Sequence, residues 1–431
     1  MLQLESAKCT FLFCLCVSLI ICSIIYLRAA NFYTPSVHTR LGTARRQCPG
    51  PIFNTNGTRW FRAEGPLDEY FQGTGLGSCT QMMLDLHFVT SPLSKEEEDY
   101  PLAFIITIHK EFETFVRLLR AIYAPQNIYC VHVDQRSTEE YKDKVRTLVG
   151  CFPNIILATV SEKVIYGGFT RLKADINCME DLVKSHIAWK KVVNLCGQDF
   201  PIQTNLELVR YMQSKEWRDR NMTPGVKQPK SMRYRTSLQY VEVASSYVAQ
   251  RGRGHKKTPP PHDLEIYFGT AYYSLTRVFV EFVLKSPVAR DFLEWSKDTY
   301  SPDEHYWVTL NHIQEAPGSH VNGGWEGAIR AIKWKEQEGL SHQGCKGHYL
   351  RDICVYGLED LKWIVERNSM FANKFESKTS AEALDCLEHW HREKVFLQAM
   401  VPIQPSWQLL EETHMSADCN TTSGPALQCE L

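Results

Sequence analysis

Short apolar runs alternate with amphipathic patterns along the chain from Pro101 onward. Continuous apolar runs predict buried strands at 102–108, 128–133, 155–158 and 192–195. Hydrophobic residues at helical spacing predict helices at 112–123, 139–149, 172–184 and 206–213. Four β/α units in succession favour a mainly parallel sheet with helices on both faces, and therefore an α/β fold.

The region after these units is polar and basic. Residues 214–262 carry the segments Arg218–Arg220 and Arg251–Lys257 and approach their end with consecutive prolines. A solvated surface loop explains such charge, but a basic loop near an active site also attracts phosphate. Residues 266–275 then return to an apolar strand pattern that includes the small residue Gly269.

The longest uncharged apolar run lies close to the amino terminus. Residues 11–27 are long enough to cross a bilayer. The run exceeds the apolar part of a usual cleavable signal peptide, and no small-x-small site follows Arg28, so a retained signal-anchor is favoured over a cleaved signal. Arginines follow the run and Lys8 precedes it, so the flanking charge does not fix its orientation.

Cysteines and glycosylation sequons indicate the orientation. Eleven of the 15 cysteines follow the apolar run, and Asn-x-Ser/Thr sequons occur at Asn56, Asn221 and Asn420. Both features are typical of proteins in an oxidising lumen. Because the chain has no repeated Cys-x-x-Cys pair, disulfides explain the cysteines better than a structural zinc site does.

These patterns divide the chain into five parts. Residues 1–10 form a cytoplasmic tail, 11–27 a transmembrane anchor, and 28–95, rich in Gly, Pro, Thr and Asn, a lumenal stem. We expect the globular domain at 96–410 and a tail at 411–431. The length of 431 residues allows a large core, and the formal net charge of −1 gives no sign of a nucleic-acid partner.

Ligands of such sheets bind beyond the carboxyl ends of the strands. That rule selects Thr107, His109, Asp134 and the turn 196–199. Asp134 suits a hydrogen bond to a ribose or a base, although a solvated turn aspartate is at least as common. The first β-to-α turn has no glycine fingerprint and the chain has no P-loop, which argues against a dinucleotide enzyme.

The segment 295–307 presents one carboxylate, Glu304, from an aromatic-rich helix start. A carboxylate that is partly shielded in this way can act as a general base on a sugar hydroxyl. Ser301, Pro302 and Glu304 also spell a capping box, in which the glutamate folds back on the cap. From these residues alone, the two interpretations stay open.

Sugar-nucleotide enzymes must neutralise a departing diphosphate, and most with this kind of sheet use a metal held by an Asp-x-Asp motif. The chain contains no Asp-x-Asp. If it binds a sugar nucleotide, fixed cations must take the role of the metal. The candidates are Arg351, between Cys345 and Cys354, and Lys374, which is also explained as a lysine that extends from a packed turn.

Several ordered motifs resemble one family of enzymes. The motifs are Arg120–Asn127, Cys130–Asp134, Cys196–Pro201, Ser301–Trp307, Leu361–Trp363 and Phe371–Phe375. From residue 92 to residue 407, the chain resembles the β-1,6-N-acetylglucosaminyltransferase branching family of core 2 and I-branching enzymes. It is more similar to the I-branching type, and to the relative numbered seven, than to the core 2 mucin type.

The resemblance implies a Golgi-resident, single-pass type II membrane enzyme of GT-A-like fold that inverts configuration without a metal or other cofactor. Its donor is expected to be UDP-GlcNAc, and its acceptor a glycan on a glycoprotein or glycolipid. Glu304 falls on the family's catalytic base, and Ser301 and Pro302 then aim its carboxylate. The positions that fall on the donor site are Thr107, Ile108, His109, Asp134, Gln135, Arg136, Tyr166, Arg351 and Lys374.

The resemblance also implies disulfides and acceptor contacts. The disulfide pairs are Cys48–Cys386, Cys79–Cys151, Cys130–Cys178 and Cys345–Cys354, with Cys196 free. Residues 221–225 lack the acceptor-contacting Glu of the core 2 type, so the mucin core is a less suitable acceptor. The acceptor-contact candidates are Lys230, Arg233, Arg235 and Trp334. Lys230 and Arg233 match the family's basic pair only with a shift, and Arg235 competes with them.

The expected reaction moves GlcNAc to a 6-hydroxyl and forms a β-1,6 linkage. A catalytically silent glycan-binding relative stays open, as does a transferase that uses another donor, such as UDP-xylose. The sequence leaves the acceptor open, and also the oligomeric state, for which a homodimer is one option. The tail with Cys419 and Cys429 matches no pattern that we recognise.

Overall fold

The structure, a computed structural model, describes residues 45–62, 67, 71, 78–244, 246–252, 254–327 and 329–409. The predicted cytoplasmic tail, the anchor at 11–27, the stem up to residue 44, the tail at 411–431 and the sequon at Asn420 lie outside these residues. Within the described part, no helix is long and apolar enough to span a membrane. A compact unit begins at Arg45.

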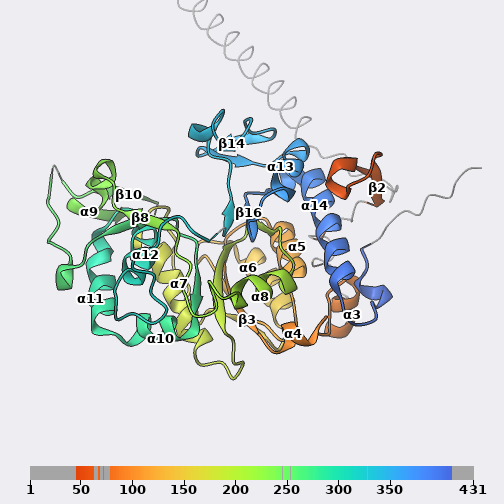
Figure 1. The fold of residues 1–431 in the computed structure, drawn as a ribbon, viewed down its shortest axis with the longest axis horizontal. Coiled ribbons are helices and arrows are strands. Elements are labelled where there is room, and N and C mark those ends of the chain that lie inside the picture. Colours follow the sequence, from red (N-terminus) through yellow and green to blue (C-terminus); the bar gives the residue numbers. More distant parts are fainter. Residues whose placement is uncertain are drawn as a thin grey trace, which may run out of the picture. The chain divides into compact units, whose positions relative to one another are not determined.

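Five strands form the central sheet (Figure 1). They are β3 (Leu102–Ile108), β4 (Ile128–Val133), β5 (Ile155–Leu157), β6 (Lys191–Cys196) and β12 (Ser274–Thr276). The strand order is β12-β6-β3-β4-β5, and every pair is parallel except β12 with β6. The predicted α/β fold with a mainly parallel sheet is therefore confirmed.

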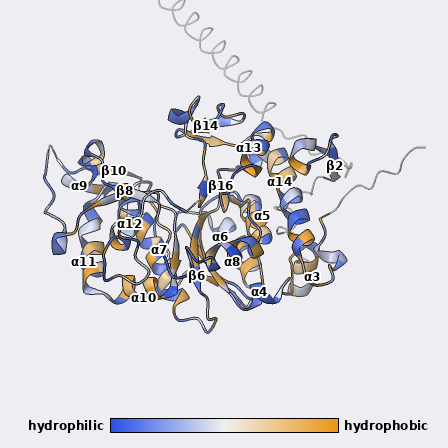
Figure 2. Ribbon diagram, in the orientation of Figure 1, coloured by the Kyte–Doolittle hydropathy of each residue, from blue (hydrophilic) through white to orange (hydrophobic). Residues whose placement is uncertain are grey.

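Alternate residues of β3 face opposite layers of helices. Phe104 and Ile106 pack with residues of α5 (Phe112–Ile122), α6 (Glu139–Val149) and α8 (Asn205–Gln213). Ala103 and Ile105 pack with residues of the helices on the other face, which are α7 (Phe169–Leu182), α10 (Arg277–Lys285), α11 (Pro287–Trp295) and α12 (Tyr306–Asn311). All of β3 is buried, as expected for a strand covered on both faces. Figure 2 shows hydrophobic colour on the central strands and both hydrophobic and hydrophilic colour along the helices around them.

The other helices and strands of the described residues lie outside this sheet. They are β1 (Arg45–Cys48), β2 (Arg59–Arg62), α3 (Cys79–Asp85), α4 (Lys95–Glu98), β7 (Asp199–Pro201), β8 (Gly225–Lys227), α9 (Tyr234–Ser237), β9 (Tyr240–Val243), β10 (Tyr247–Gln250), β11 (Tyr267–Gly269), β13 (Arg330–Ala331), β14 (His348–Leu350), β15 (Ile353–Val355), α13 (Leu361–Val365), β16 (Phe371–Asn373) and α14 (Ser377–Gln398). The strand predicted at 266–275 is thus two strands, β11 and β12, in different sheets.

A second sheet, of order β13-β16-β7, is joined to the end of β6, where the backbone N of Cys196 donates to Asp199 Oδ2 at 2.7 Å. Arg330 on β13 pairs with Asp199 on β7, with 3.1 Å between Nη2 and Oδ2, and its guanidinium lies 4.7 Å from the ring centre of Phe371. Asn373 donates from Nδ2 to Oδ1 of the same aspartate at 3.0 Å. These contacts fix the end of β16, and with it Lys374, beside the turn that follows β6.

Part of the region predicted as a stem, up to residue 95, belongs to the compact unit that begins at Arg45. Cys48 bonds to Cys386 in α14, and Cys79 bonds to Cys151 after α6. Met82 and Leu86 are buried in the same hydrophobic cluster as one face of β3. Apolar burial and two cross-links therefore hold this Gly- and Pro-rich region against the globular domain.

All four implied disulfides are present in the structure. Besides the two above, Cys130 bonds to Cys178 and so joins β4 to α7, and Cys345 bonds to Cys354. Among the cysteines of the described residues, Cys196 is free. Disulfides persist in oxidising compartments, so the structure fits the lumenal environment that the cysteine count predicts.

The structure contradicts the prediction that the sequon at Asn221 is a glycosylation site. Asn221 is 1% exposed, and its Nδ2, the atom that would carry a glycan, donates to Asn311 Oδ1 at 3.0 Å and to Pro317 O at 2.9 Å. Its Oδ1 accepts from the backbone N of Thr276 at 2.9 Å. A buried amide that is hydrogen-bonded on both sides has no room for a sugar.

We therefore expect glycopeptide mapping of the secreted protein to find Asn221 unmodified. Asn56 is exposed and open to modification, so it serves as the internal comparison. Substitution of Asn221 by Ala should lower the free energy of unfolding by about 2–4 kcal/mol, because several buried polar groups lose their partners. A glycan found on Asn221 in folded protein would contradict this part of the structure.

Candidate active site

The carboxyl ends of β3, β4 and β6 meet at one edge of the central sheet. Asp134, after β4, donates from its backbone N to Ile108 O at 2.9 Å, and Gly197, after β6, donates to Thr107 O at 3.1 Å. His109, after β3, is exposed at the same edge. The hydroxyl of Thr107 is buried and has no hydrogen-bond partner among the described residues. The strand ends thus come together as predicted, with an unpartnered polar atom among them.

Asp134 is held by its neighbour Arg136. The carboxylate accepts a hydrogen bond from the backbone N of Arg136 at 2.8 Å and pairs with its Nη2 at 2.8 Å. Burial raises the pKa of Asp134, but the hydrogen bonds and the charge of Arg136 outweigh burial and hold the pKa below its usual range. Because Asp134 is 3% exposed, the interpretation as a solvated turn aspartate is wrong. Gln135 lies between the two, with its backbone N donating to Glu162 O at 3.0 Å.

Glu304 ends a single 3-10 turn, Pro302–Glu304, that precedes α12. Its Oε2 pairs with Nη1 of Arg235, whereas no described residue hydrogen-bonds to Oε1. The capping-box interpretation is wrong, because Ser301 has a left-handed backbone with φ of 47° and its side chain caps nothing. Instead, the backbone N of Ser301 donates to Gly167 O at 2.7 Å and ties this turn to the loop that carries Tyr166.

Arg235 is fixed between two aromatic rings. Its guanidinium carbon lies 5.3 Å from the ring centres of both Phe268 and Tyr300. Its backbone O accepts a hydrogen bond from Tyr300 N at 3.1 Å. Two cation–π contacts and a backbone hydrogen bond restrict the position of the arginine. Arg235 therefore anchors one oxygen of the Glu304 carboxylate and leaves the other open.

The electrostatic surroundings suit Glu304 to accept a proton. Burial raises the pKa of Glu304, while the charge of Arg235 and its hydrogen bond act against the rise. Burial also raises the pKa of the neighbouring Asp303, where Arg171 opposes the effect and the charge of Glu304 adds to it. A carboxylate with a raised pKa is a better proton acceptor than one in water.

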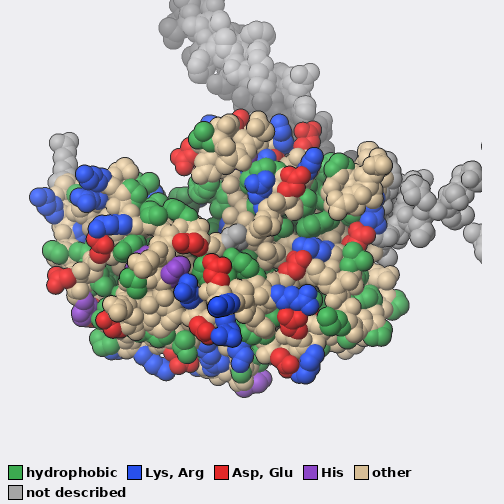
Figure 3. Space-filling view, in the orientation of Figure 1, with side chains coloured by type: hydrophobic (Ala, Val, Ile, Leu, Met, Phe, Trp, Pro, Cys, Tyr) green, Lys and Arg blue, Asp and Glu red, His purple; other side chains and the backbone are tan. Residues whose placement is uncertain are grey.

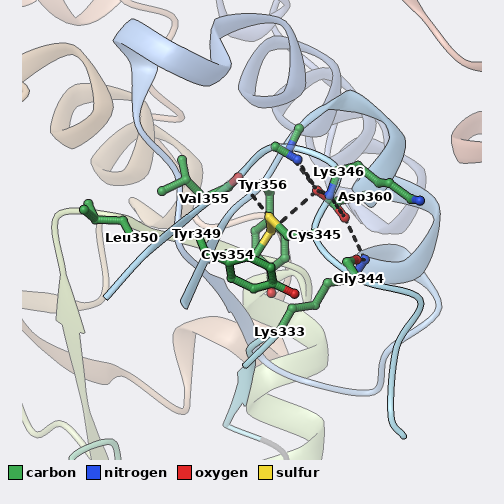
Figure 4. Close-up of a disulfide and its surroundings, with 12 residues drawn as sticks. Lys333, Gly344, Cys345, Lys346, Tyr349, Leu350, Cys354, Val355, Tyr356 and Asp360 are labelled. Atoms are coloured by element: carbon green, nitrogen blue, oxygen red, sulfur yellow. Dashed lines mark hydrogen bonds and ion pairs between the residues drawn. A yellow bond between two sulfur atoms is a disulfide. The ribbon is translucent and has the colours of Figure 1, made fainter. Parts of the chain in front are cut away.

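Arg351 lies at the tip of the hairpin formed by β14 and β15. Arg351 and Asp352 have φ of 53° and 62°, which matches a two-residue hairpin turn with positive φ at both positions. The Cys345–Cys354 disulfide closes the base of this hairpin, and Asp360 binds the backbone beside it (Figure 4). The guanidinium of Arg351 is exposed and stacks 4.7 Å from the ring centre of Tyr166.

Lys374 follows β16 and points toward the same hairpin. It is 7% exposed, and its Nζ donates to Leu350 O, directly before Arg351, at 2.9 Å. The interpretation of Lys374 as a lysine that extends into solvent is therefore wrong. Burial lowers the pKa of Lys374, Glu376 opposes this effect, and the nearby charge of Arg351 adds to it. Two cations, one buried and one exposed, thus converge near Tyr166 and the strand ends.

A sequence model of the Core-2/I-Branching enzyme family matches residues 102–365. The match covers more than half of the chain and includes the three strand ends, Glu304 and Arg351. The chain belongs to the Core-2/I-branching enzyme family. The family resemblance seen in the sequence motifs is thereby confirmed.

Relatives within the branching-enzyme family are similar over most of their length. The human probable beta-1,3-galactosyl-O-glycosyl-glycoprotein beta-1,6-N-acetylglucosaminyltransferase 7 is 54% identical over 347 residues, which cover 80% of each chain. The human N-acetyllactosaminide beta-1,6-N-acetylglucosaminyl-transferase is 53% identical over 333 residues, which cover 77% of this chain and 82% of the relative. The human beta-1,3-galactosyl-O-glycosyl-glycoprotein beta-1,6-N-acetylglucosaminyltransferase 3 is 41% identical over 327 residues, 73% of this chain and 74% of the relative.

The structure separates the acceptor-contact candidates of this branching-enzyme chain. Arg235 lies at Glu304, whereas Lys230 and Arg233 are exposed and their side chains bond to no described residue. Trp334 forms a bridge with Ile353 and so lies beside the hairpin that carries Arg351. Only Arg235 among the four candidates therefore contacts the Glu304 carboxylate, and Trp334 lies at the hairpin instead.

Sequence reasoning missed the side chains that position these groups in the branching-enzyme site. Tyr300 directly precedes Ser301, so its motif was a usable signal. Phe268 and Arg171 carried no signal, because they act through contacts distant in sequence. Arg171 pairs with Asp175 at 2.6 Å, and it acts on Asp303 through its charge.

Proposed function

We propose that this chain is an inverting glycosyltransferase that moves GlcNAc from UDP-GlcNAc to a 6-hydroxyl of an acceptor glycan and forms a β-1,6 linkage. The observation that carries the proposal is the arrangement of the two carboxylate oxygens of Glu304. One carboxylate oxygen is anchored by Arg235 and the other is open, on a turn that Ser301 ties to the loop of Tyr166. The relatives' names, which describe β-1,6-N-acetylglucosaminyltransferases, support the same reaction class.

In the proposed reaction, the open oxygen of Glu304 takes the proton of the acceptor 6-hydroxyl. The acceptor oxygen attacks the anomeric carbon of the donor from the face opposite to the diphosphate. A carbon–oxygen bond forms as the bond from the anomeric carbon to the diphosphate oxygen breaks, and UDP leaves with the electron pair. A single displacement of this kind converts the α-linked donor into a β-linked product.

The diphosphate requires positive charge as it departs. Arg351 and Lys374 supply two cations without the metal that an Asp-x-Asp motif would hold. Lys374 is fixed by Leu350 O and Arg351 by the ring of Tyr166, so both charges are oriented before the reaction. In this proposal, Thr107, Asp134 and Arg136 at the strand ends bind the uridine and ribose.

The proposed location is the Golgi lumen, with the chain held as a single-pass type II protein by residues 11–27. The four disulfides support an oxidising lumen. The apolar run of the sequence supports the anchor. Expression of the full chain with a tag at either end, followed by protease protection of the sealed vesicles, would test this orientation.

A donor comparison tests the proposed function. The secreted protein from Arg45 onward is incubated with a lactosamine-type acceptor and either UDP-GlcNAc or UDP-xylose, with and without EDTA. Transfer from UDP-GlcNAc that EDTA does not reduce supports the proposal. Transfer from UDP-xylose alone, or loss of activity in EDTA, contradicts the donor or the role of the fixed cations.

The pH dependence tests the role of Arg235. Glu304 must be ionised to accept a proton, and Arg235 opposes the rise of its pKa on burial. Removal of that charge in Arg235→Gln raises the pKa, so the acid limb of the kcat profile should move to higher pH by about one unit. Arg235→Lys retains the charge and should move the limb less. An increased KM for the acceptor with an unchanged pH profile would show that Arg235 only binds the acceptor.

A further inference from the structure

Residues 227–257 are strongly basic in a chain that is nearly neutral. They contain four Lys, four Arg and one acidic residue, Glu242, whereas the whole chain has a formal net charge of −1. Figure 3 shows Lys and Arg side chains gathered over the end of the molecule where Figure 1 draws α9 and β10. The sequence left two explanations, a solvated loop and a loop that attracts an anion.

Some of these cations already have anionic partners. Lys227 pairs with Glu265, Lys257 with Asp298, and Arg235 with Glu304. Four others are exposed and form no ion pair with any described residue. We call these four the basic rim: Lys230, Arg233, Arg251 and Lys256.

Backbone hydrogen bonds hold the rim together. Arg251 donates from its backbone N to Gln239 O at 2.8 Å, and Leu238 forms a bridge with Lys256. Leu238 directly follows α9, and Arg233 directly precedes that helix. The two parts of the rim, though separated in sequence, therefore lie along the same short stretch of chain.

The rim begins next to the catalytic carboxylate. Arg235 in α9 holds Glu304, and Arg233 lies two residues before it. The cations assigned to the diphosphate, Arg351 and Lys374, belong to the hairpin side of the site. The basic rim is therefore separate from the donor cations. Its link to Glu304 is α9, which carries Arg235 and is preceded by Arg233.

Two exposed tyrosines lie on the same elements as the rim. Tyr234 in α9 is 46% exposed and Tyr247 in β10 is 57% exposed. The hydroxyl of Tyr240 donates to the backbone O of Tyr234 at 3.4 Å, so β9 is tied to α9. Exposed rings offer flat apolar surface with a polar tip, which suits a sugar ring, while the cations suit an anionic substituent.

We propose that the basic rim and these tyrosines form an extended acceptor subsite for an anionic glycan, whose charge is a sulfate ester or a sialic acid carboxylate. The inference rests on the proposed function, because it assumes that Glu304 meets the sugar to be extended. A glycan is favoured over a lipid surface because the rim is continuous with the residue that holds Glu304.

Binding measurements test the subsite without relying on turnover. The secreted protein from Arg45 onward is titrated, in the presence of UDP, with three forms of one lactosamine-type tetrasaccharide: neutral, monosulfated and sialylated. We expect at least one anionic form to bind about tenfold tighter than the neutral form at low salt, and the preference to shrink as the ionic strength rises. The two anionic arms distinguish sulfate from carboxylate.

Reversing the charge of two rim residues tests whether the basic rim causes the preference for anionic glycans. Arg251→Glu with Lys256→Glu should abolish the anionic preference and leave the affinity for the neutral tetrasaccharide within about twofold. Lys215→Glu is the matched control, because Lys215 is an exposed lysine that follows α8 and lies outside the rim. Equal binding of all three glycans, or a preference that survives the reversal, would overturn the inference.

Three further outcomes separate this inference from a membrane contact and from the proposed function. Tighter binding to vesicles of phosphatidylserine and phosphatidylcholine than to any glycan would overturn it in favour of a membrane contact. Transfer of GlcNAc to the neutral and anionic acceptors at equal kcat/KM, with equal binding, would overturn the subsite and leave the proposed function standing. Anionic preference in binding without any transfer would support a site for anionic glycans at the basic rim, but it would contradict the proposed function and, with it, the role of that site in holding an acceptor.

Discussion

Glu304→Gln is expected to lower kcat by about 10²- to 10⁴-fold, because the amide keeps the size of the side chain but cannot take the proton of the acceptor hydroxyl. The affinity for UDP should stay within about twofold, since the proposed donor cations lie on or beside the β14–β15 hairpin and not on the turn that carries Glu304. Steady-state kinetics with UDP-GlcNAc and calorimetric titration with UDP measure the two quantities on the same preparation.

A matched variant guards against a general loss of fold. Glu315→Gln removes an exposed carboxyl from the loop after α12 and should leave kcat unchanged. Glu304 pairs with Arg235, so the midpoint of thermal unfolding should also be compared among the three proteins. A Glu304→Gln enzyme with normal kcat and normal fold would remove Glu304 from the mechanism.

Arg351→Ala is expected to lower kcat/KM for the donor by about 10²- to 10³-fold, because one of two fixed cations at the diphosphate is lost. The side chain is exposed at a hairpin tip, so its removal should not disturb the fold. Lys374→Met should have a comparable effect on the donor, although Lys374 is buried and this variant needs a check of its stability. Affinity for UDP should fall in both variants.

Two other arginine substitutions serve as controls for this prediction: one changes the side chain at position 351, and the other removes an arginine elsewhere. Arg351→Lys should recover part of the activity, since lysine keeps the charge but loses the flat stack on Tyr166. Arg367→Ala removes a similar stacked arginine, 4.9 Å from the ring centre of Trp363, outside the proposed site and should leave the kinetics unchanged. Unchanged donor kcat/KM in Arg351→Ala would exclude the arginine from diphosphate binding.

The order of strands and helices could be predicted because it depends on local pattern. Every β/α unit from β3 to α8 appears where the apolar runs and helical spacing placed it, within a few residues at each end. The predictions failed where contacts between residues distant in sequence decide the structure. Asn221 looks like a surface sequon, but its amide is enclosed by residues near 276, 311 and 317. The region after Arg45 looks like a stem, but disulfides and buried methionine and leucine bind it to the core.

In the candidate site, too, features set by local pattern could be predicted, and features set by contacts between distant residues could not. The strand ends that carry Thr107 and Asp134 follow from topology, and Glu304 follows from its motif. The partner of Glu304 does not, because 69 residues separate it from Arg235. The capping-box pattern at Ser301 also depends on geometry, since a left-handed residue at that position turns the glutamate away from the cap. Pairings between distant residues carry no local sequence signal.

The linkage of the product tests the central claim most directly. The secreted protein is incubated with UDP-GlcNAc and a lactosamine-type acceptor, and the product is examined by NMR for the position and anomeric configuration of the new bond. We predict GlcNAc in β configuration on a 6-hydroxyl. A product with α configuration, attachment at another hydroxyl, or release of free GlcNAc without transfer would contradict the account.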